Sequence, residues 1–160
     1  MLSSYNTYST SVGIVNNNKP FIKFVKTHND AQLPTKAHKT DTGYDLYCVE
    51  DTVIYSRLHG IVPVGLQVAD ITPGYWYLIL PRSGLGFKHQ LQPHLGVIDS
   101  GYRGSLDVQI YNFSDKDYTF KKGDRVAQIA FYPLVNMETS FADEVTVTDR
   151  GNKGTGSSGK

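Results

Sequence analysis

The sequence has little that would tie the chain to a disulfide scaffold, a structural metal or a membrane. Cys48 is the single cysteine among 160 residues, so no internal disulfide can form and no cysteine cluster offers a zinc site. The five histidines show no metal-ligand spacing. Apolar runs are short, as in Trp76–Leu80, whereas a membrane-spanning helix needs about 20 consecutive apolar residues. We therefore expect no membrane partner.

An excess of charge of either sign is also missing. Sixteen Lys and Arg residues stand against 15 Asp and Glu residues, a net charge of +1. This balance argues against a stable nucleic-acid partner but is compatible with a small basic pocket for a phosphorylated ligand. The polar start of the chain carries no basic-then-apolar signal pattern. We therefore expect a cytoplasmic protein, or one of the host cytoplasm or nucleus if the source is viral.

Short β-prone runs broken by turn residues are what the chain does have. Recurrent Gly and Pro separate runs such as Phe21–Val25, Tyr75–Leu80 and Val126–Leu134, and Leu106–Tyr111 alternates apolar with polar residues. Few stretches keep a helical period. The pattern therefore predicts an all-β sandwich, jelly roll or barrel.

Composition divides the chain into three expected parts. Ser, Thr and Asn dominate residues 1–20, which we expect to be a flexible leader. The β domain is expected over residues 21–149. The Gly- and Ser-rich residues 150–160 have nothing to pack and are expected to form a mobile tail.

The segment Pro81–Gly84 follows a predicted strand that ends at Leu80. Arg82 offers a guanidinium, Ser83 a hydroxyl and Gly84 an approachable backbone N–H, and these three groups suit phosphate oxygens. The same residue types also suit a solvated turn. Taken alone, this segment leaves both interpretations open.

A second candidate segment surrounds Asp99. Two β-prone runs flank Asp99-Ser100-Gly101, which predicts a β-hairpin with Gly101 at positive φ. A carboxylate at such a position can orient and deprotonate a water molecule, although aspartate is also an ordinary turn residue. Gln128, where a turn enters a strand, can donate to an anion or simply face solvent.

The tail Gly154–Lys160 fits the first part of the phosphate-loop pattern G-x-x-x-x-G-K. A nucleotide-hydrolase P-loop also needs a preceding buried strand and a following helix. No residue follows Lys160 to supply that helix, so we reject the P-loop interpretation. A glycine-rich run of N–H groups can nevertheless wrap a phosphate.

Five segments, taken in order, resemble the five motifs of the trimeric deoxyuridine triphosphatase (dUTP diphosphatase, dUTPase) family. The matching segments are Thr42–Leu46, Pro81–Gly86, Gly96–Gly104, Gly123–Ile129 and Arg150–Gly159. Five motifs in one order are highly specific, and they span about three quarters of the chain.

The resemblance implies a jelly-roll-like β-clip barrel and a homotrimer with three active sites shared between subunits. The implied reaction converts dUTP and water into dUMP and pyrophosphate with the assistance of Mg²⁺. Such a reaction limits uracil in DNA and supplies dUMP for thymidylate synthesis.

The resemblance also implies roles for individual residues. Asp99 matches the carboxylate that activates the attacking water, Tyr102 the ring under the deoxyribose, and Asp45 a carboxylate near the water shell of the metal. The implied phosphate-binding positions are Arg82, Ser83, Gly84 and Gln128, the uracil-reading main chain is that of Leu95, Gly96, Val97 and Ile98, and the closing tail contributes Arg150, Ser157 and Ser158.

Two departures from the family pattern stand out. Thr155 replaces the phenylalanine that stacks on uracil, so the tail is expected to close more weakly or another ring to substitute. Gly101 stands where many relatives carry aspartate, which we expect to matter little. Two alternatives remain: a nucleotide-sensing or protein-binding trimer, and a dCTP deaminase. Deamination is disfavoured because Gln109 stands where the deaminase glutamate would fall, and glutamine cannot cycle a proton.

Overall fold

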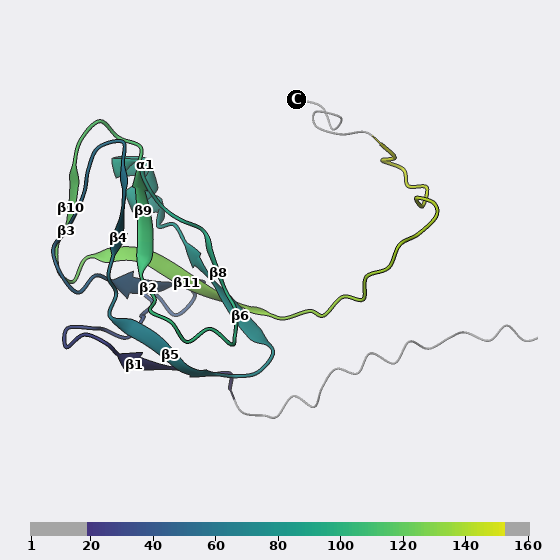
Figure 1. The fold of residues 1–160 in the computed structure, drawn as a ribbon, viewed down its shortest axis with the longest axis horizontal. Coiled ribbons are helices and arrows are strands. Elements are labelled where there is room, and N and C mark those ends of the chain that lie inside the picture. The colour runs from purple at the N-terminus through teal and green to yellow at the C-terminus, as the bar shows by residue number, and fades with distance from the viewer. Residues whose placement is uncertain (1–18, 153–160) are drawn as a thin grey trace, which may run out of the picture.

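The computed structural model describes residues 19–152, which form a β-rich body and an extended C-terminal arm (Figure 1). The elements of this part are β1 (Ile22–Lys26), β2 (Tyr44–Tyr47), β3 (Thr52–Ile54), β4 (His59–Val62), β5 (Leu66–Ile71), β6 (Tyr75–Leu80), α1 (Ser83–His89), β7 (Leu91–Pro93), β8 (Gly96–Ile98), β9 (Val108–Asn112), β10 (Tyr118–Phe120) and β11 (Arg125–Pro133). The all-β prediction is confirmed, and β6 has the predicted bounds.

The strands form four antiparallel sheets, ordered β1-β5, β10-β3, β2-β11-β6-β8 and β4-β9-β7. Their inward side chains fill one shared hydrophobic core. Fully buried members from different sheets include Leu46, Val62, Leu66, Ile110, Phe120 and Ile129. Because each strand is short, the sheets stabilise one another through this core rather than individually.

The sheet β2-β11-β6-β8 has two unlike faces, because side chains alternate along a strand. On one face Tyr77 of β6 and Ile129 of β11 are at most 1% exposed. On the other face, Leu80 and Gln128 are partly exposed, and Val97 of β8 is 62% exposed. The candidate site lies on this second, partly exposed face.

The predicted hairpin at Asp99 is not formed. The chain does reverse there, and the Tyr102 N–H donates to the carbonyl oxygen of Asp99 at 3.0 Å, but Gly101 does not have a positive φ. After the turn, the chain does not return beside β8. Leu106 is buried and donates its N–H to Leu66 of β5, and β9 then pairs with β4 and β7.

The helix α1 is a second departure from the sequence prediction. Its Ser-Gly-Leu-Gly start contains two poor helix formers, so the segment reads as a turn. The segment nevertheless forms a helix, because Leu85 packs into the core at 6% exposure and the Arg82 carbonyl oxygen accepts hydrogen bonds from the N–H groups of Leu85 and Gly86.

The C-terminal arm, residues 134–152, leaves the end of β11 and runs away from the body (Figure 1). It exposes large apolar side chains: Phe141 and Val147 are fully exposed, and Met137 is 78% exposed. Most of the predicted leader and most of the predicted tail lie outside the described residues. Among residues 19–152, no helix has the length and hydrophobicity required to cross a membrane.

Candidate active site

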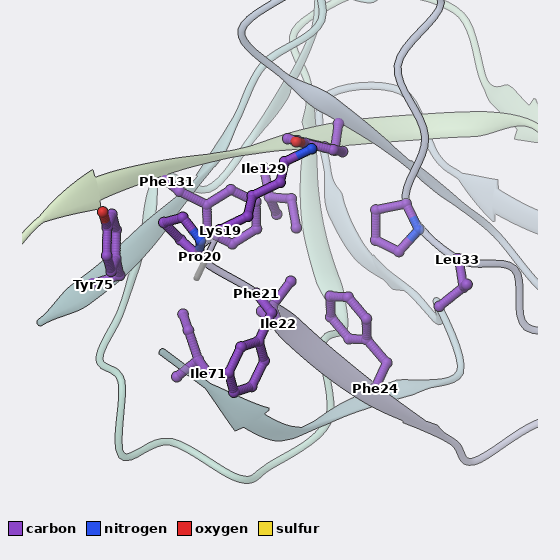
Figure 2. Close-up of a pocket in the computed structure, with 12 residues that line it drawn as sticks. Lys19, Pro20, Phe21, Ile22, Phe24, Leu33, Ile71, Tyr75, Ile129 and Phe131 are labelled. Atoms are coloured by element: carbon purple, nitrogen blue, oxygen red, sulfur yellow. The ribbon is translucent and has the colours of Figure 1, made fainter. Parts of the chain in front are cut away.

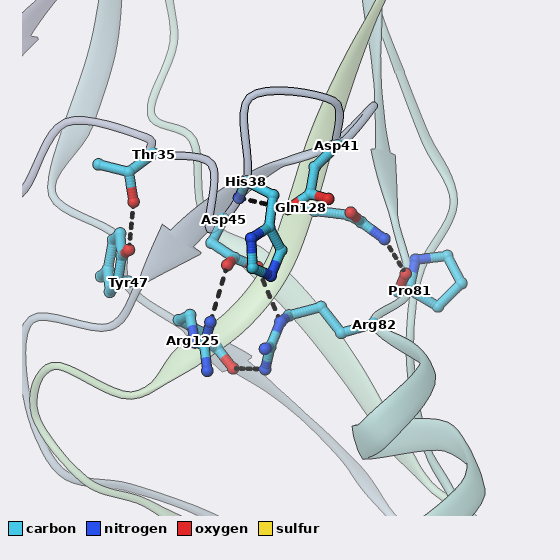
Figure 3. Close-up of polar contacts among 9 residues, drawn as sticks. All are labelled: Thr35, His38, Asp41, Asp45, Tyr47, Pro81, Arg82, Arg125 and Gln128. Carbon is cyan, nitrogen blue, oxygen red and sulfur yellow. Dashed lines mark hydrogen bonds and ion pairs between the residues drawn. The ribbon is translucent and has the colours of Figure 1, made fainter.

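Three elements that are distant in sequence bring the first, second and fourth motifs together. Gln128 of β11 pairs with Asp45 of β2 on one side and with Leu80 of β6 on the other. Arg82 follows β6 immediately. The pairing of a central strand with two neighbours therefore places Asp45, Arg82 and Gln128 at one end of the sheet (Figure 3).

Asp45 is held between two arginines. Its Oδ1 accepts the Nε–H of Arg82 at 2.8 Å, and its Oδ2 accepts an Nη1–H of Arg125 at 3.2 Å (Figure 3). Arg82 also donates from Nη1 to the carbonyl oxygen of Arg125 at 3.1 Å. Two guanidinium groups against one carboxylate leave a positive surplus at the site, which favours an anionic ligand.

Arg125 was missed as a site residue by the sequence analysis. It belongs to the fourth motif, three residues before Gln128, but no spacing argument connects it with Asp45. Only the pairing of β2 with β11 brings them together. The side chain of Asp45 is 14% exposed and that of Arg82 is 23% exposed, so this pair is shielded enough to fix the orientation of the Arg82 guanidinium.

Gln128 is oriented from two sides. Its Nε2 donates to the carbonyl oxygen of Pro81 at 2.7 Å (Figure 3). A Cβ built on Gly43 would lie 1.8 Å from Oε1 of Gln128, so a larger residue at position 43 would displace the carboxamide. The glycine of the first motif thus has a packing reason, which the sequence pattern alone does not reveal.

Ser83 and Gly84 open the first turn of α1, where backbone N–H groups lack intrahelical acceptors. Arg82 is the extended N-cap residue, and its side chain makes no capping bond. A Cβ built on Gly84 would meet no atom of the described part of the chain within 4 Å. The body therefore does not require glycine at this position, and the backbone is open to close approach by a ligand.

A groove of about 640 Å³ lies beside these residues. Its lining includes Arg82, Ser83 and Gln128, together with the aromatic side chains of Phe87 and Phe113. Phe87 is 90% exposed. The groove thus combines cationic and hydrogen-bonding groups with apolar walls, which is typical of a site for an organic phosphate.

A second hollow, of about 500 Å³, has a different character (Figure 2). Aliphatic and aromatic side chains from β1, β5 and β11 line it, among them Phe24, Ile71 and Phe131. Among the described residues that line it, Lys19 is the one with a charged side chain. This composition does not match a polyphosphate.

The third motif lies on β8 and the turn after it. Within residues 19–152, β8 is an edge strand that pairs with β6 alone, so one row of its backbone N–H and C=O groups has no strand partner in this part of the chain. Leu95 and Val97 are 56% and 62% exposed. The unpaired edge of this segment, Leu95, Gly96, Val97 and Ile98, can therefore offer main-chain donors and acceptors to a planar ligand.

Asp99 and Tyr102 are exposed in the turn after β8. Tyr102 is 44% exposed, and its hydroxyl donates to the carbonyl oxygen of Ser105 at 3.1 Å. A Cβ on Gly104 would lie 2.2 Å from the Tyr102 hydroxyl, so the glycine leaves room for the ring to fold back over the turn.

Asp99 lies far from Arg82 within one chain. Ile98 pairs with Tyr77 and Gly96 with Ile79, so β8 moves away from Arg82 as it approaches Asp99. Asp99 consequently stands near Trp76, at the opposite end of β6, about 20 Å from Arg82 at about 3.3 Å per residue. The structure thus groups Asp45, Arg82, Ser83, Gly84 and Gln128 but separates them from Asp99.

Arg150 is exposed and belongs to the C-terminal arm, which runs away from the body (Figure 1). Ser157 and Ser158 lie outside the described residues. The tail positions implied by the resemblance therefore stay predictions.

The residues present suit an indirect contact with magnesium. Among residues 19–152, no group of three or more His, Cys, Asp and Glu side chains is arranged to hold a metal ion. Both oxygens of Asp45 are engaged by arginines. Because Mg²⁺ retains several waters and is commonly bound through substrate phosphates, Asp45 fits a contact through a metal-bound water rather than direct ligation.

An all-β body with a cationic, glycine-flanked groove at its strand ends defines a protein class that binds a phosphorylated organic ligand. Comparison with known proteins narrows this class. The model of the dUTPase family matches residues 29–159. A deoxyuridine 5'-triphosphate nucleotidohydrolase of Debaryomyces hansenii is 39% identical over 139 residues, which cover 86% of each chain.

Solved structures agree. The dUTPase of Staphylococcus bacteriophage 80alpha with dUPNHPP is 29% identical, with a TM-score of 0.80 over 88% of this chain and 99% of that one. A mutant dUTPase of S. aureus phage phi11, which coordinates a structural Mg(II) ion, is 25% identical, with a TM-score of 0.71 over 79% of this chain and 99% of that one. The chain belongs to the dUTPase family.

Proposed function

We propose that this chain hydrolyses dUTP to dUMP and pyrophosphate at sites shared between the subunits of a homotrimer. Membership of the dUTPase family supports this reaction, and the relatives named above are named as dUTPases or deoxyuridine 5'-triphosphate nucleotidohydrolases. The reaction limits uracil in DNA and supplies dUMP for thymidylate synthesis.

The observation that carries the shared site is the separation within one chain. The phosphate-suited residues around Arg82 and the carboxylate of Asp99 stand at opposite ends of β6, about 20 Å apart at the usual strand rise. A water-activating base must lie within hydrogen-bond reach of the water that attacks phosphorus. Asp99 of one subunit must therefore act on phosphates held by Arg82 of another.

Exposed apolar surface supports association of the chains. Val97 on the edge strand is 62% exposed, and Phe141 and Val147 on the arm are fully exposed. Large exposed apolar side chains on one face and one arm are typical of an interaction surface. A closed ring of identical subunits would cover these side chains and complete each site.

In the proposed mechanism, Arg82, Ser83, Gly84 and Gln128 hold the phosphate chain. The positive surplus around Asp45 balances part of its charge, and Mg²⁺, when bound to the phosphates, would neutralise more of it. Asp99 accepts the proton of a water molecule as its oxygen attacks phosphorus, and pyrophosphate leaves.

Nucleoside recognition is assigned to β8 and the turn. The free backbone edge of Leu95–Ile98 pairs with the uracil edge, and a base with the wrong donor and acceptor pattern would leave these groups unpaired. Tyr102 packs under the deoxyribose and excludes a 2′-hydroxyl. Arg150, Ser157 and Ser158 are assigned to the tail that closes over the triphosphate.

The first experiment replaces Asp99 with asparagine, which keeps the shape but removes the base. Pyrophosphate release from dUTP should fall by about 10²- to 10⁴-fold, with a smaller change in KM. The exposed carboxylate of Asp107 provides a matched control, since Asp107→Asn should retain activity. Equal turnover by wild type and Asp99→Asn would show that Asp99 is not the base.

A nucleotide panel tests the substrate and the metal. We expect pyrophosphate from dUTP, far less from dTTP, dCTP and UTP, and a marked loss when Mg²⁺ is removed. Ammonia release from dCTP would instead establish the deaminase alternative. Tight nucleotide binding without pyrophosphate release would support the sensing alternative.

A further inference from the structure

Tyr77 carries the one buried side-chain polar atom, among residues 19–152, that lacks a hydrogen-bond partner. The residue is 1% exposed and lies in the middle of β6, on the face that packs into the core. Buried hydroxyl groups are almost always paired, because an unpaired one loses its hydration without compensation. We therefore expect the Tyr77 hydroxyl to make a hydrogen bond in some state of the protein.

The surroundings of Tyr77 connect it with the turn that carries Asp99 and Tyr102. Its backbone pairs with Ile98, the last residue of β8 before that turn. Its ring lies 5.7 Å from the ring of Phe131. The turn runs from Ile98 to Leu106, and Leu106 is buried in the same core cluster as Tyr77. Burial raises the pKa of the Tyr77 hydroxyl, so the hydroxyl stays protonated and can donate a hydrogen bond.

The hydrogen bonds of the turn are mainly between its own residues. Arg103 donates from Nη1 to the carbonyl oxygens of Ser100 and Tyr102 at 2.7 and 2.9 Å. Tyr102 donates its N–H to Asp99 and its hydroxyl to Ser105. The Tyr102 hydroxyl oxygen keeps a lone pair that can accept a further hydrogen bond.

We propose that Tyr77 is a positioning residue for Tyr102. When the nucleotide seats its sugar on the Tyr102 ring, the Tyr77 hydroxyl donates to the Tyr102 hydroxyl, which continues to donate to Ser105. This chain of hydrogen bonds fixes the height of the ring and thereby sharpens the selection of deoxyribose over ribose. The inference rests on the proposed placement of the sugar on Tyr102.

The test compares Tyr77→Phe with Tyr75→Phe, a matched control two residues earlier on the same face of β6. KM and kcat are measured for dUTP and UTP, together with the melting temperature. Tyr77→Phe should raise KM for dUTP about five- to tenfold, the loss expected for one hydrogen bond, and lower the preference for dUTP over UTP. Its melting temperature should be unchanged or higher, because the variant removes an unpaired hydroxyl.

A double-mutant cycle with Tyr102→Phe tests the proposed partner. In the Tyr102→Phe background, Tyr77→Phe should have no further effect on KM. Additive effects, or an unchanged KM and dUTP preference in Tyr77→Phe alone, would overturn the inference. If Tyr102→Ala also left the dUTP preference unchanged, the proposed placement of the sugar would fail as well, so the two failures are distinguishable.

Discussion

At the scale of single residues, the site depends on small side chains as much as on charged ones. Gly43 leaves room for the carboxamide of Gln128, and Gly104 leaves room for the ring of Tyr102. These two glycines are required by packing inside the body. Gly84 differs, because no atom of the described chain lies near the position of its missing Cβ.

This difference leads to a prediction for Gly84→Ala. Alanine should leave folding intact, or stabilise α1 by about 0.5–1 kcal/mol, because it is a better helix former than glycine. If a phosphate approaches this backbone, the added methyl group should raise KM for dUTP on the order of tenfold by weakening a charge-assisted hydrogen bond. Steady-state kinetics and thermal unfolding measure the two effects.

Gly86→Ala is the matched control for this variant. It lies on the same helix, and its added Cβ would make only an ordinary contact at 3.9 Å with the carbonyl oxygen of Leu91. It should share the stabilisation without the rise in KM. A Gly84→Ala enzyme with wild-type KM would remove Gly84 from the phosphate site.

At the scale of elements, Asp51 ties the start of β3 to the turn between β10 and β11. Its Oδ2 lies 2.7 Å from Nζ of Lys121, and its Oδ1 accepts the Lys122 N–H at 2.9 Å. The hydrogen bond that Lys121 donates to Asp51 lowers the pKa of Asp51 and raises the pKa of Lys121.

These shifts predict a pH window for Asp51→Asn. The Asp51 contribution to stability is present above its ordinary pKa of 3.8 and is lost as pH falls through the lowered pKa. The Lys121 contribution is present below its ordinary pKa of 10.5 and is lost as pH rises through the raised pKa. Asp51→Asn should therefore be less stable than wild type only between these limits, by a small amount because both groups are exposed.

Urea unfolding at a series of pH values measures this window. Asp115→Asn, an exposed carboxylate in the neighbouring β9–β10 connection, should show no such window. A difference between Asp51→Asn and wild type that persisted well below pH 3.8 would contradict the assignment.

Much of the element list could be predicted from the sequence, because apolar alternation and turn residues report on strands directly. The β6 run and the alternation through Leu106–Tyr111 are examples, with Leu106 and Ile110 buried as expected. The partner of each strand could not be predicted, since local pattern does not encode register. For this reason the prediction of a hairpin at Asp99 was wrong, and the contact between Arg125 and Asp45 was missed.

At the scale of the whole molecule, the proposal places the two halves of the site on different subunits. This arrangement predicts complementation between inactive variants. Asp99→Asn and Arg82→Ala should each be nearly inactive alone. When the two are unfolded together and refolded as a mixture, about one quarter of the sites should combine a native Arg82 with a native Asp99 by random assortment.

The measurement is dUTP hydrolysis by the mixture, compared with each variant refolded alone. Activity near a quarter of the wild-type value supports a site formed between chains. A mixture no more active than its components would show that each site lies within one chain, and that the arrangement around β6 must change before catalysis.

The length of β6 has a consequence for the cell. If the site is shared as proposed, a lone chain can be correctly folded and still inactive, because its Asp99 cannot reach phosphates held by its own Arg82. The total activity then depends on protein concentration in two ways. Concentration sets the number of chains, and it also sets the fraction of chains that has assembled. In the proposed trimer, a low concentration of chains would by itself lower activity, and a copy that lacks one half of the site would inactivate the site that it completes with a neighbour.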